Sequence, residues 1–112
     1  VLGAFEVAEN GDFANWTLSL TDAVPAVGGA MDLAAGAKRL WVVMEHTSKE
    51  GAPKLLKACE LPLTGVGVVD LVISDLGVFE IDKHGTGPMK LLELADGVTR
   101  EEIAAKTQAA FV

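Results

Sequence analysis

Two stretches near the start of the chain combine residue types that could do chemistry. Glu9 directly precedes Asn10-Gly11, so its carboxylate is either a nucleophile presented on a tight turn or part of a hairpin loop. Asn-Gly suits the positive φ angles of primed hairpin turns, so the local pattern favours the loop. The pair Gly28-Gly29 opens a short predicted helix. Its backbone amides could stabilise an anion or a developing oxyanion, or the two glycines only allow a sharp turn.

A third stretch, Glu45, His46 and Thr47, follows the apolar run at residues 40–44. An unbroken apolar run predicts a strand covered on both faces, and ligands collect outside the carboxyl ends of such strands. His46 beside a carboxylate could act as a general acid or base. It could equally be a solvated strand-end histidine, or one hydrogen-bonded to a loop carbonyl. His84 lies in a glycine-rich loop and is expected to be exposed, and two histidines without ligand spacing predict no metal site.

Composition limits the partners and the compartment. The 112 residues fit one domain, and half of them are apolar. Sixteen acidic and nine dispersed basic residues give a charge of −7, so nucleic-acid binding is not expected. No apolar run is long enough for a membrane span. Cys59 is the only cysteine; we interpret it as a half-buried structural thiol in a reducing compartment, the cytoplasm. The chain begins at Val1 within an apolar pattern and reads as an excerpt of a longer protein.

Hydrophobic periodicity and turn residues predict the elements that must position these groups. Thr99 and Glu102 have the spacing of a capping box at a helix start. Gly36 is expected to stop the earlier helix. We expect strands at residues 1–7, 13–18, 40–44 and 89–94, a strand pair at 68–81 that breaks near 74–77, an irregular connection at 61–65, and helices at 31–35 and after 99. This order predicts an α/β fold, an open mostly parallel sheet with flanking helices and an antiparallel addition.

Five segments in order resemble one family over nearly the whole chain. They resemble the C-terminal half of the B subunit of the 3-oxoacid CoA-transferases, including the 3-oxoadipate (β-ketoadipate) type. The segments read "GGAMDLAAGAKR" leading into "VVMEHT", then "LPLTG", "VFEI" and "LLELADGVTREEIAAKT". By this resemblance, residues 1–112 are the C-terminal part of a single domain, that of a CoA-transferase B subunit, and the fold is incomplete without the rest.

The resemblance implies that CoA moves from succinyl-CoA or a similar acyl-CoA to a 3-oxo acid through a glutamyl-CoA thioester. No metal or redox cofactor is implied, and coenzyme A is part of the substrate. The implied partners are the A subunit and the N-terminal half of the B subunit. The family's catalytic Glu-Asn-Gly lies far upstream, so Glu9 corresponds to a second, non-catalytic turn and no residue here is assigned as the nucleophile. Gly28 and Gly29 would bind the substrate or its oxyanion, with Glu45, His46 and Thr47 bordering the same cleft.

Two departures from the family keep other interpretations open. Residues 19–27 lack the Pro-Gly-Lys and Lys-Gly elements usual in relatives, and Val66 replaces a frequent lysine. The substrate acid could therefore differ, or the chain could be a degenerate, non-catalytic assembly partner. A third interpretation, a sugar-phosphate isomerase on a related scaffold, is disfavoured because basic residues directed at phosphate are absent near Gly28. The isolated chain is expected to be inactive and prone to associate.

Overall fold

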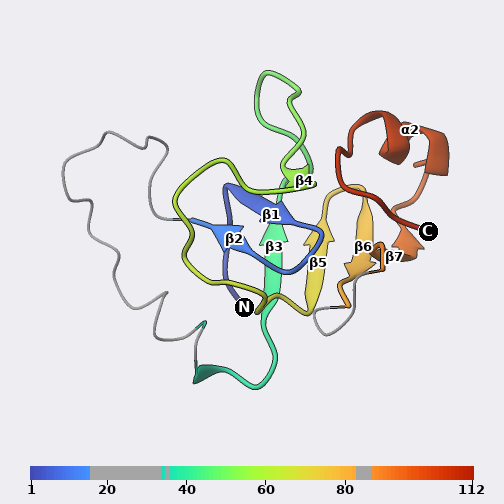
Figure 1. Cartoon of the computed structure of the whole chain (residues 1–112). Helices are drawn as coiled ribbons and strands as arrows, with labels where there is room; N and C mark the ends of the chain where they lie inside the picture. The colour runs from blue at the N-terminus through green and yellow to red at the C-terminus, as the bar shows by residue number, and fades with distance from the viewer. Residues whose placement is uncertain (16–33, 35, 83–86) are drawn as a thin grey trace.

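Where it can be described, the chain forms two small β-sheets and a C-terminal helix that share one core (Figure 1). A computed structural model describes residues 1–15, 34, 36–82 and 87–112. The three-stranded sheet has the order β2-β1-β4, and the four-stranded sheet has the order β3-β5-β6-β7. The strands are β1 (Glu6–Ala8), β2 (Phe13–Ala14), β3 (Trp41–Met44), β4 (Leu55–Leu56), β5 (Leu71–Ser74), β6 (Gly77–Glu80) and β7 (Lys90–Leu94), and the helix is α2 (Arg100–Ala105).

The predicted α/β class is confirmed, with sheets more mixed than expected. Strands β1 and β4 pair in parallel, as do β3 and β5. The other pairs, β1–β2, β5–β6 and β6–β7, are antiparallel. Short connections explain two of the antiparallel pairs, since residues 9–12 join β1 to β2 and residues 75–76 join β5 to β6. A tight turn can join only antiparallel neighbours, whereas a parallel pair needs a long crossover.

The hairpin predicted around Asn10-Gly11 is confirmed. Gly11 has φ 96°, and a Cβ at this position would meet the backbone of Gly67 at 3.3 Å. Asn10 Oδ1 accepts a hydrogen bond from the backbone N–H of Asp12 at 3.1 Å. Turn conformation and close backbone approach therefore both require glycine at position 11.

The strand break and the Thr99 half of the predicted capping box are confirmed. Ser74 Oγ accepts hydrogen bonds from the backbone N–H groups of Leu76 (3.2 Å) and Gly77 (3.3 Å), which turns the chain from β5 into β6. Thr99 caps α2 by accepting a bond from the N–H of Glu102 at 3.1 Å. The Glu102 carboxylate pairs with Lys106 at 3.1 Å.

One prediction about β3 is wrong: the strand is not covered on both faces. Its burial alternates, so that Val42 is fully buried whereas Trp41 is 38% and Val43 is 48% exposed. Within the described part of the chain, packing covers only the inner face of the four-stranded sheet. The core on that side contains Val7, Phe13, Ala34, Val42, Leu55, Val72, Phe79, Met89 and Ile103.

The C-terminal segment, residues 107–112, lies across both sheets. Gln108 and Ala109 donate backbone hydrogen bonds to Leu55 O of β4, at 3.0 and 3.2 Å. Three residues later, Val112 exchanges backbone bonds with the start of β7, donating to Met89 O at 2.8 Å. This segment therefore ties one sheet to the other.

Several predicted features lie wholly or partly outside the described residues. These are the end of the strand at 13–18, the Gly28-Gly29 turn, most of the helix at 31–35, and His84. Gly36 was expected to follow the last helical residue, but it is itself helical, as Ala34 is, and Ala37 is the first residue outside the helix. Among the residues that can be described, no helix is long and apolar enough to cross a membrane.

Candidate active-site region

The structure divides the predicted trio Glu45, His46 and Thr47 between the interior and the surface. The three residues follow β3, where the backbone still alternates its side chains. His46 is only 1% exposed, whereas Glu45 is exposed and Thr47 is half-buried. Glu45 and His46 therefore do not form an acid–base pair in this structure.

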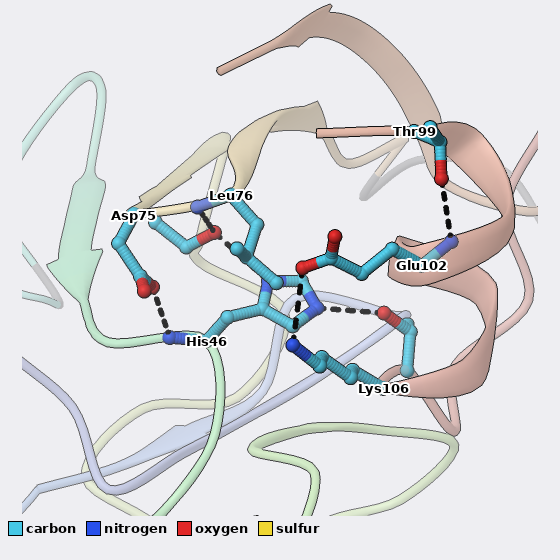
Figure 2. A network of polar contacts seen from close by, with 8 residues as sticks. His46, Asp75, Leu76, Thr99, Glu102 and Lys106 are labelled. Atoms are coloured by element: carbon cyan, nitrogen blue, oxygen red, sulfur yellow. Dashed lines mark hydrogen bonds and ion pairs between the residues drawn. The ribbon is translucent and has the colours of Figure 1, made fainter. Parts of the chain in front are cut away.

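Both ring nitrogens of His46 are hydrogen-bonded to hydroxyl groups (Figure 2). Nδ1 lies 2.8 Å from Ser74 Oγ, and Nε2 lies 2.7 Å from Thr107 Oγ1. The backbone N–H of His46 donates to Asp75 Oδ1 at 2.8 Å, and the ring packs against Phe79 with centroids 5.6 Å apart. His46 thus joins the end of β3, the β5–β6 turn and the C-terminal segment.

The surroundings of His46 favour the neutral imidazole. Burial lowers the pKa of His46 below its usual 6.5, Asp75 partly opposes this by attracting the imidazolium, and Lys106 lowers the pKa further by repulsion. A hydroxyl can donate or accept, so Ser74 and Thr107 satisfy either neutral tautomer. A buried imidazole with both ring nitrogens hydrogen-bonded holds the neighbouring segments in place.

Glu45 and Thr47 line a shallow groove of about 380 Å³ at the carboxyl end of β3. The other lining residues are Phe5, Ser48, Lys49, Glu50 and Lys54. Two lysines and two hydroxyl groups could bind a phosphate or carboxylate, but the two glutamates offset the lysine charges. The groove can thus contact a polar substrate without a strong preference for anions.

A larger groove, of about 760 Å³, lies where β1 and β4 end. Glu9, Asn10, Lys57, Ala58, Gly87, Pro88 and Ala110 line it. Glu9 lies in the hairpin turn, and its Oε2 accepts a hydrogen bond from the backbone N–H of Ala110 at 2.9 Å. This bond ties the turn to the C-terminal segment, which gives the carboxylate a structural task and supports the interpretation of Glu9 as a turn residue.

Sequence reasoning did not single out Thr107 or Asp75, which hold His46. The strand break predicted at residues 74–77 includes Asp75, but the break indicates only a turn and not the bond from the His46 backbone to the Asp75 carboxylate. No local pattern marks Thr107, because it meets His46 only through the tertiary fold. Gly28 and Gly29 lie outside the described residues, so their predicted role stays a prediction.

Cys59 is half-buried, as expected. Burial raises its pKa to about 12, and the nearby carboxylates of Glu6 and Asp12 add to this effect. The thiol is therefore protonated and a poor nucleophile. Within the described residues, no group of three His, Cys, Asp or Glu side chains is placed to hold a metal ion.

Two mixed sheets and a helix define an α/β protein with polar groups at its strand ends. Comparison with known proteins identifies the family. Residues 1–106 match the coenzyme A transferase family, and the chain belongs to it. It is 48% identical over 99% of its length to the B subunit of the succinyl-CoA:3-ketoacid coenzyme A transferase of Helicobacter pylori. It is 42% identical to the B subunit of the 3-oxoadipate CoA-transferase of Acinetobacter baylyi. The predicted resemblance is confirmed.

The chain spans about half the length of these relatives, 52% and 50% respectively. Among solved structures, it resembles the decarboxylase AibA/AibB with TM-score 0.75 and 28% identity, covering 99% of this chain and 46% of that one. An acyl-CoA transferase (YdiF) of Escherichia coli has TM-score 0.74 at 19% identity, with 99% of this chain and 25% of that one covered, and shows the fold alone. The scaffold thus accompanies more than one reaction.

Proposed function

We propose that the chain is the C-terminal half of the B subunit of a CoA-transferase. The proposed reaction moves CoA from succinyl-CoA, or a similar acyl-CoA, to a 3-oxo acid such as 3-oxoadipate or acetoacetate. The similarity to the B subunit of the H. pylori enzyme along 99% of the chain is the observation that carries this proposal. The partners would be the A subunit and the N-terminal half of the B subunit, and the complex would act in the cytoplasm.

The chemistry requires a carboxylate nucleophile, which we place outside residues 1–112. Its attack on the acyl-CoA thioester forms a tetrahedral oxyanion, and collapse expels the CoA thiolate and leaves an acyl-glutamyl anhydride. The thiolate then attacks the glutamyl carbonyl and releases the acid, giving the glutamyl-CoA thioester. The 3-oxo acid accepts CoA by the reverse sequence, so the cycle needs no metal or redox cofactor.

This chain would supply binding and orientation. Backbone amides at Gly28 and Gly29 are the proposed donors to the oxyanion, since pre-oriented amides stabilise developing charge without reorganisation. Glu45 and Thr47 would contact the substrate from the groove after β3. His46 would hold the end of β3 in place from the protein interior, through its hydrogen bonds to Ser74 and Thr107.

The experiment uses the whole B subunit with its A subunit. The complex is incubated with succinyl-CoA, and mass spectrometry locates any CoA adduct on a glutamate. We expect an adduct on a glutamate outside this chain and none on Glu9. An adduct on Glu9 would refute the assignment of Glu9 as a turn residue.

A second candidate is a non-catalytic assembly partner. Val66 stands where relatives frequently have a lysine, and it is 70% exposed. Packing inside this chain therefore does not explain why the lysine was replaced, whereas loss of a substrate contact would. A complex that assembles with the A subunit yet forms no adduct with any acyl-CoA would favour this candidate. The similarity to the decarboxylase AibA/AibB calls for one further measurement, CO₂ release from the acyl-CoA, which a transferase does not produce.

A further inference from the structure

Two consecutive residues of the loop after β4, Thr64 and Gly65, contact the chain on both sides of residues 16–33. Asn15 is the last described residue before that stretch, and it is hydrogen-bonded to Thr64. Ala34 is the first described residue after it, and its Cβ lies 3.4 Å from the point where a Cβ on Gly65 would be. The pair, hereafter the Thr64-Gly65 anchor, therefore joins two points that are far apart in sequence.

The contact between Thr64 and Asn15 is reciprocal and mostly shielded from solvent. The Thr64 hydroxyl accepts a hydrogen bond from the backbone N–H of Asn15 at 3.0 Å and donates one to Asn15 Oδ1 at 2.6 Å. Thr64 is 7% exposed. The Asn15 side chain also donates to Gly3 O at 3.2 Å. Because one hydroxyl makes both bonds, a side chain of the same shape without the hydroxyl would lose both.

Gly65 allows the second contact because it has no side chain. A Cβ at this position would lie 2.7 Å from Val68 Cγ2 and 3.0 Å from Phe13 Cε1, in addition to its contact with Ala34. Phe13 is fully buried, Ala34 is 3% exposed, and both belong to the core. Backbone bonds hold the loop here, since Phe13 N–H donates to Gly65 O at 3.1 Å and Thr64 N–H donates to Phe13 O at 2.8 Å.

Support of the three-stranded sheet alone does not explain these two features. Such a role would need only the backbone bonds to Phe13, which most residue types could make. The hydroxyl of Thr64 and the space left at Gly65 also reach the residues that flank 16–33. A stretch whose two ends are fixed at one point has far fewer conformations than one with free ends. The anchor therefore restricts where this stretch can lie.

We propose that Thr64 and Gly65 are positioning residues for the stretch that carries Gly28 and Gly29. This inference rests on the proposed function, because it takes the amides of those two glycines as the donors to the oxyanion. Such donors stabilise developing charge only when their direction is fixed before the reaction. The anchor acts through the two ends of the stretch and not by contact with substrate. Its loss should therefore lower kcat and leave substrate binding nearly unchanged.

The test compares Thr64→Val, which keeps the shape of the side chain but removes its hydroxyl, with Thr64→Ser, which keeps the hydroxyl. Both are made in the whole B subunit, assembled with the A subunit and followed by hydrogen exchange and mass spectrometry. We expect Thr64→Val to exchange about 10-fold faster in residues 16–33 and at the wild-type rate in α2. Thr64→Ser should match the wild type in both. Asn15→Ala, which removes half of the contact, is the second variant if Thr64→Val does not fold.

Thr99→Ala is the matched control for a loss of stability elsewhere. It removes the N-cap bond of α2, so it should speed exchange in α2 and leave residues 16–33 at the wild-type rate.

Turnover of the same assembled complexes with succinyl-CoA and acetoacetate is the second readout. Thr64→Val should lower kcat about 10- to 100-fold, with KM for succinyl-CoA changed by less than about 3-fold, because misplaced donors weaken only the transition state. Thr64→Ser should restore kcat to near the wild-type value.

Four outcomes would overturn the inference. Exchange that rises in α2 as well as in residues 16–33 would show a general loss of stability. Unchanged exchange in residues 16–33 would show that the anchor does not hold them. A wild-type kcat despite faster local exchange would separate the anchor from catalysis. A raised KM with unchanged kcat would indicate direct contact with substrate. A wild-type complex that transfers no CoA would contradict the proposed function, whereas faster exchange confined to residues 16–33 in Thr64→Val would still support the anchor.

Discussion

Replacing His46 by Phe should destabilise the chain mainly at neutral pH. The variant keeps an aromatic ring against Phe79 and removes the hydrogen bonds to Ser74 and Thr107. Each bond contributes about 1 kcal/mol, and a hydroxyl left without its partner costs about 1 kcal/mol more. We therefore expect a loss of about 2–3 kcal/mol in the free energy of unfolding at pH 7.5, a large share of the roughly 5–15 kcal/mol of a typical domain.

The lowered pKa of His46 determines how the stability lost in this variant changes with pH. Because the pKa of His46 is lowered in the folded state, the imidazole is neutral in both states well above pH 6.5, and its contribution is complete there. Below pH 6.5 the unfolded chain binds a proton that the folded chain does not, and stability falls by up to about 1.4 kcal/mol per pH unit until the folded pKa is reached. The variant lacks this slope, so the difference between the two proteins should narrow from about pH 7.5 to about pH 5.5.

Urea unfolding followed by circular dichroism at about pH 7.5, 6.5 and 5.5 measures both quantities. Thr107→Val is the matched control, since it removes one hydrogen bond, keeps the imidazole and should retain the acid slope at a cost of about 1 kcal/mol. A difference between the wild type and His46→Phe that stays constant or widens toward acid pH would refute the reasoning.

Three further substitutions or reactions test the fold. Gly77→Ala should cost about 1–3 kcal/mol by urea unfolding, because its Cβ would lie 2.6 Å from Glu93 O, whereas Gly87→Ala, which has open space, should be nearly neutral. Thr99→Ala should cost about 1 kcal/mol by the same measurement, since it removes the N-cap bond of α2; an unchanged midpoint would contradict that role. Cys59 should react with iodoacetamide far more slowly than glutathione at about pH 8, and equal rates would contradict its raised pKa of about 12.

Local chemistry made the turns and most elements predictable from sequence. The Asn10-Gly11 hairpin, the break at residues 74–77 and the Thr99 cap depend on interactions between residues close in sequence. Such interactions leave a recognisable pattern of residue types. The α/β class followed from the order of these elements.

The exposed face of β3 and the surroundings of His46 were not predictable in the same way. An apolar run indicates a preference for burial, but it does not say whether the covering layer belongs to the same stretch of chain. The contact between His46 and Thr107 joins residues 61 positions apart, which no local spacing encodes. The candidate oxyanion donors at Gly28 and Gly29 were suggested by the glycine pair before a helix and then by the family resemblance. The match over residues 1–106 confirms the family, and the role of the two glycines stays a prediction.

The segment that ties the two sheets together also sets an order on folding. The bond from Ala110 to Glu9 closes a loop over 101 positions in sequence, and the neighbouring bonds to Leu55 span more than fifty. Contacts of this range form slowly, because the entropy of closing the loop is lost before the contact is gained. The hairpins at Gly11 and Ser74 can form within microseconds. The bonds that connect the two sheets through residues 107–112 form later, because they join segments far apart in sequence. Until that segment docks, His46 lacks its partner Thr107 and the core between the sheets is open on one side.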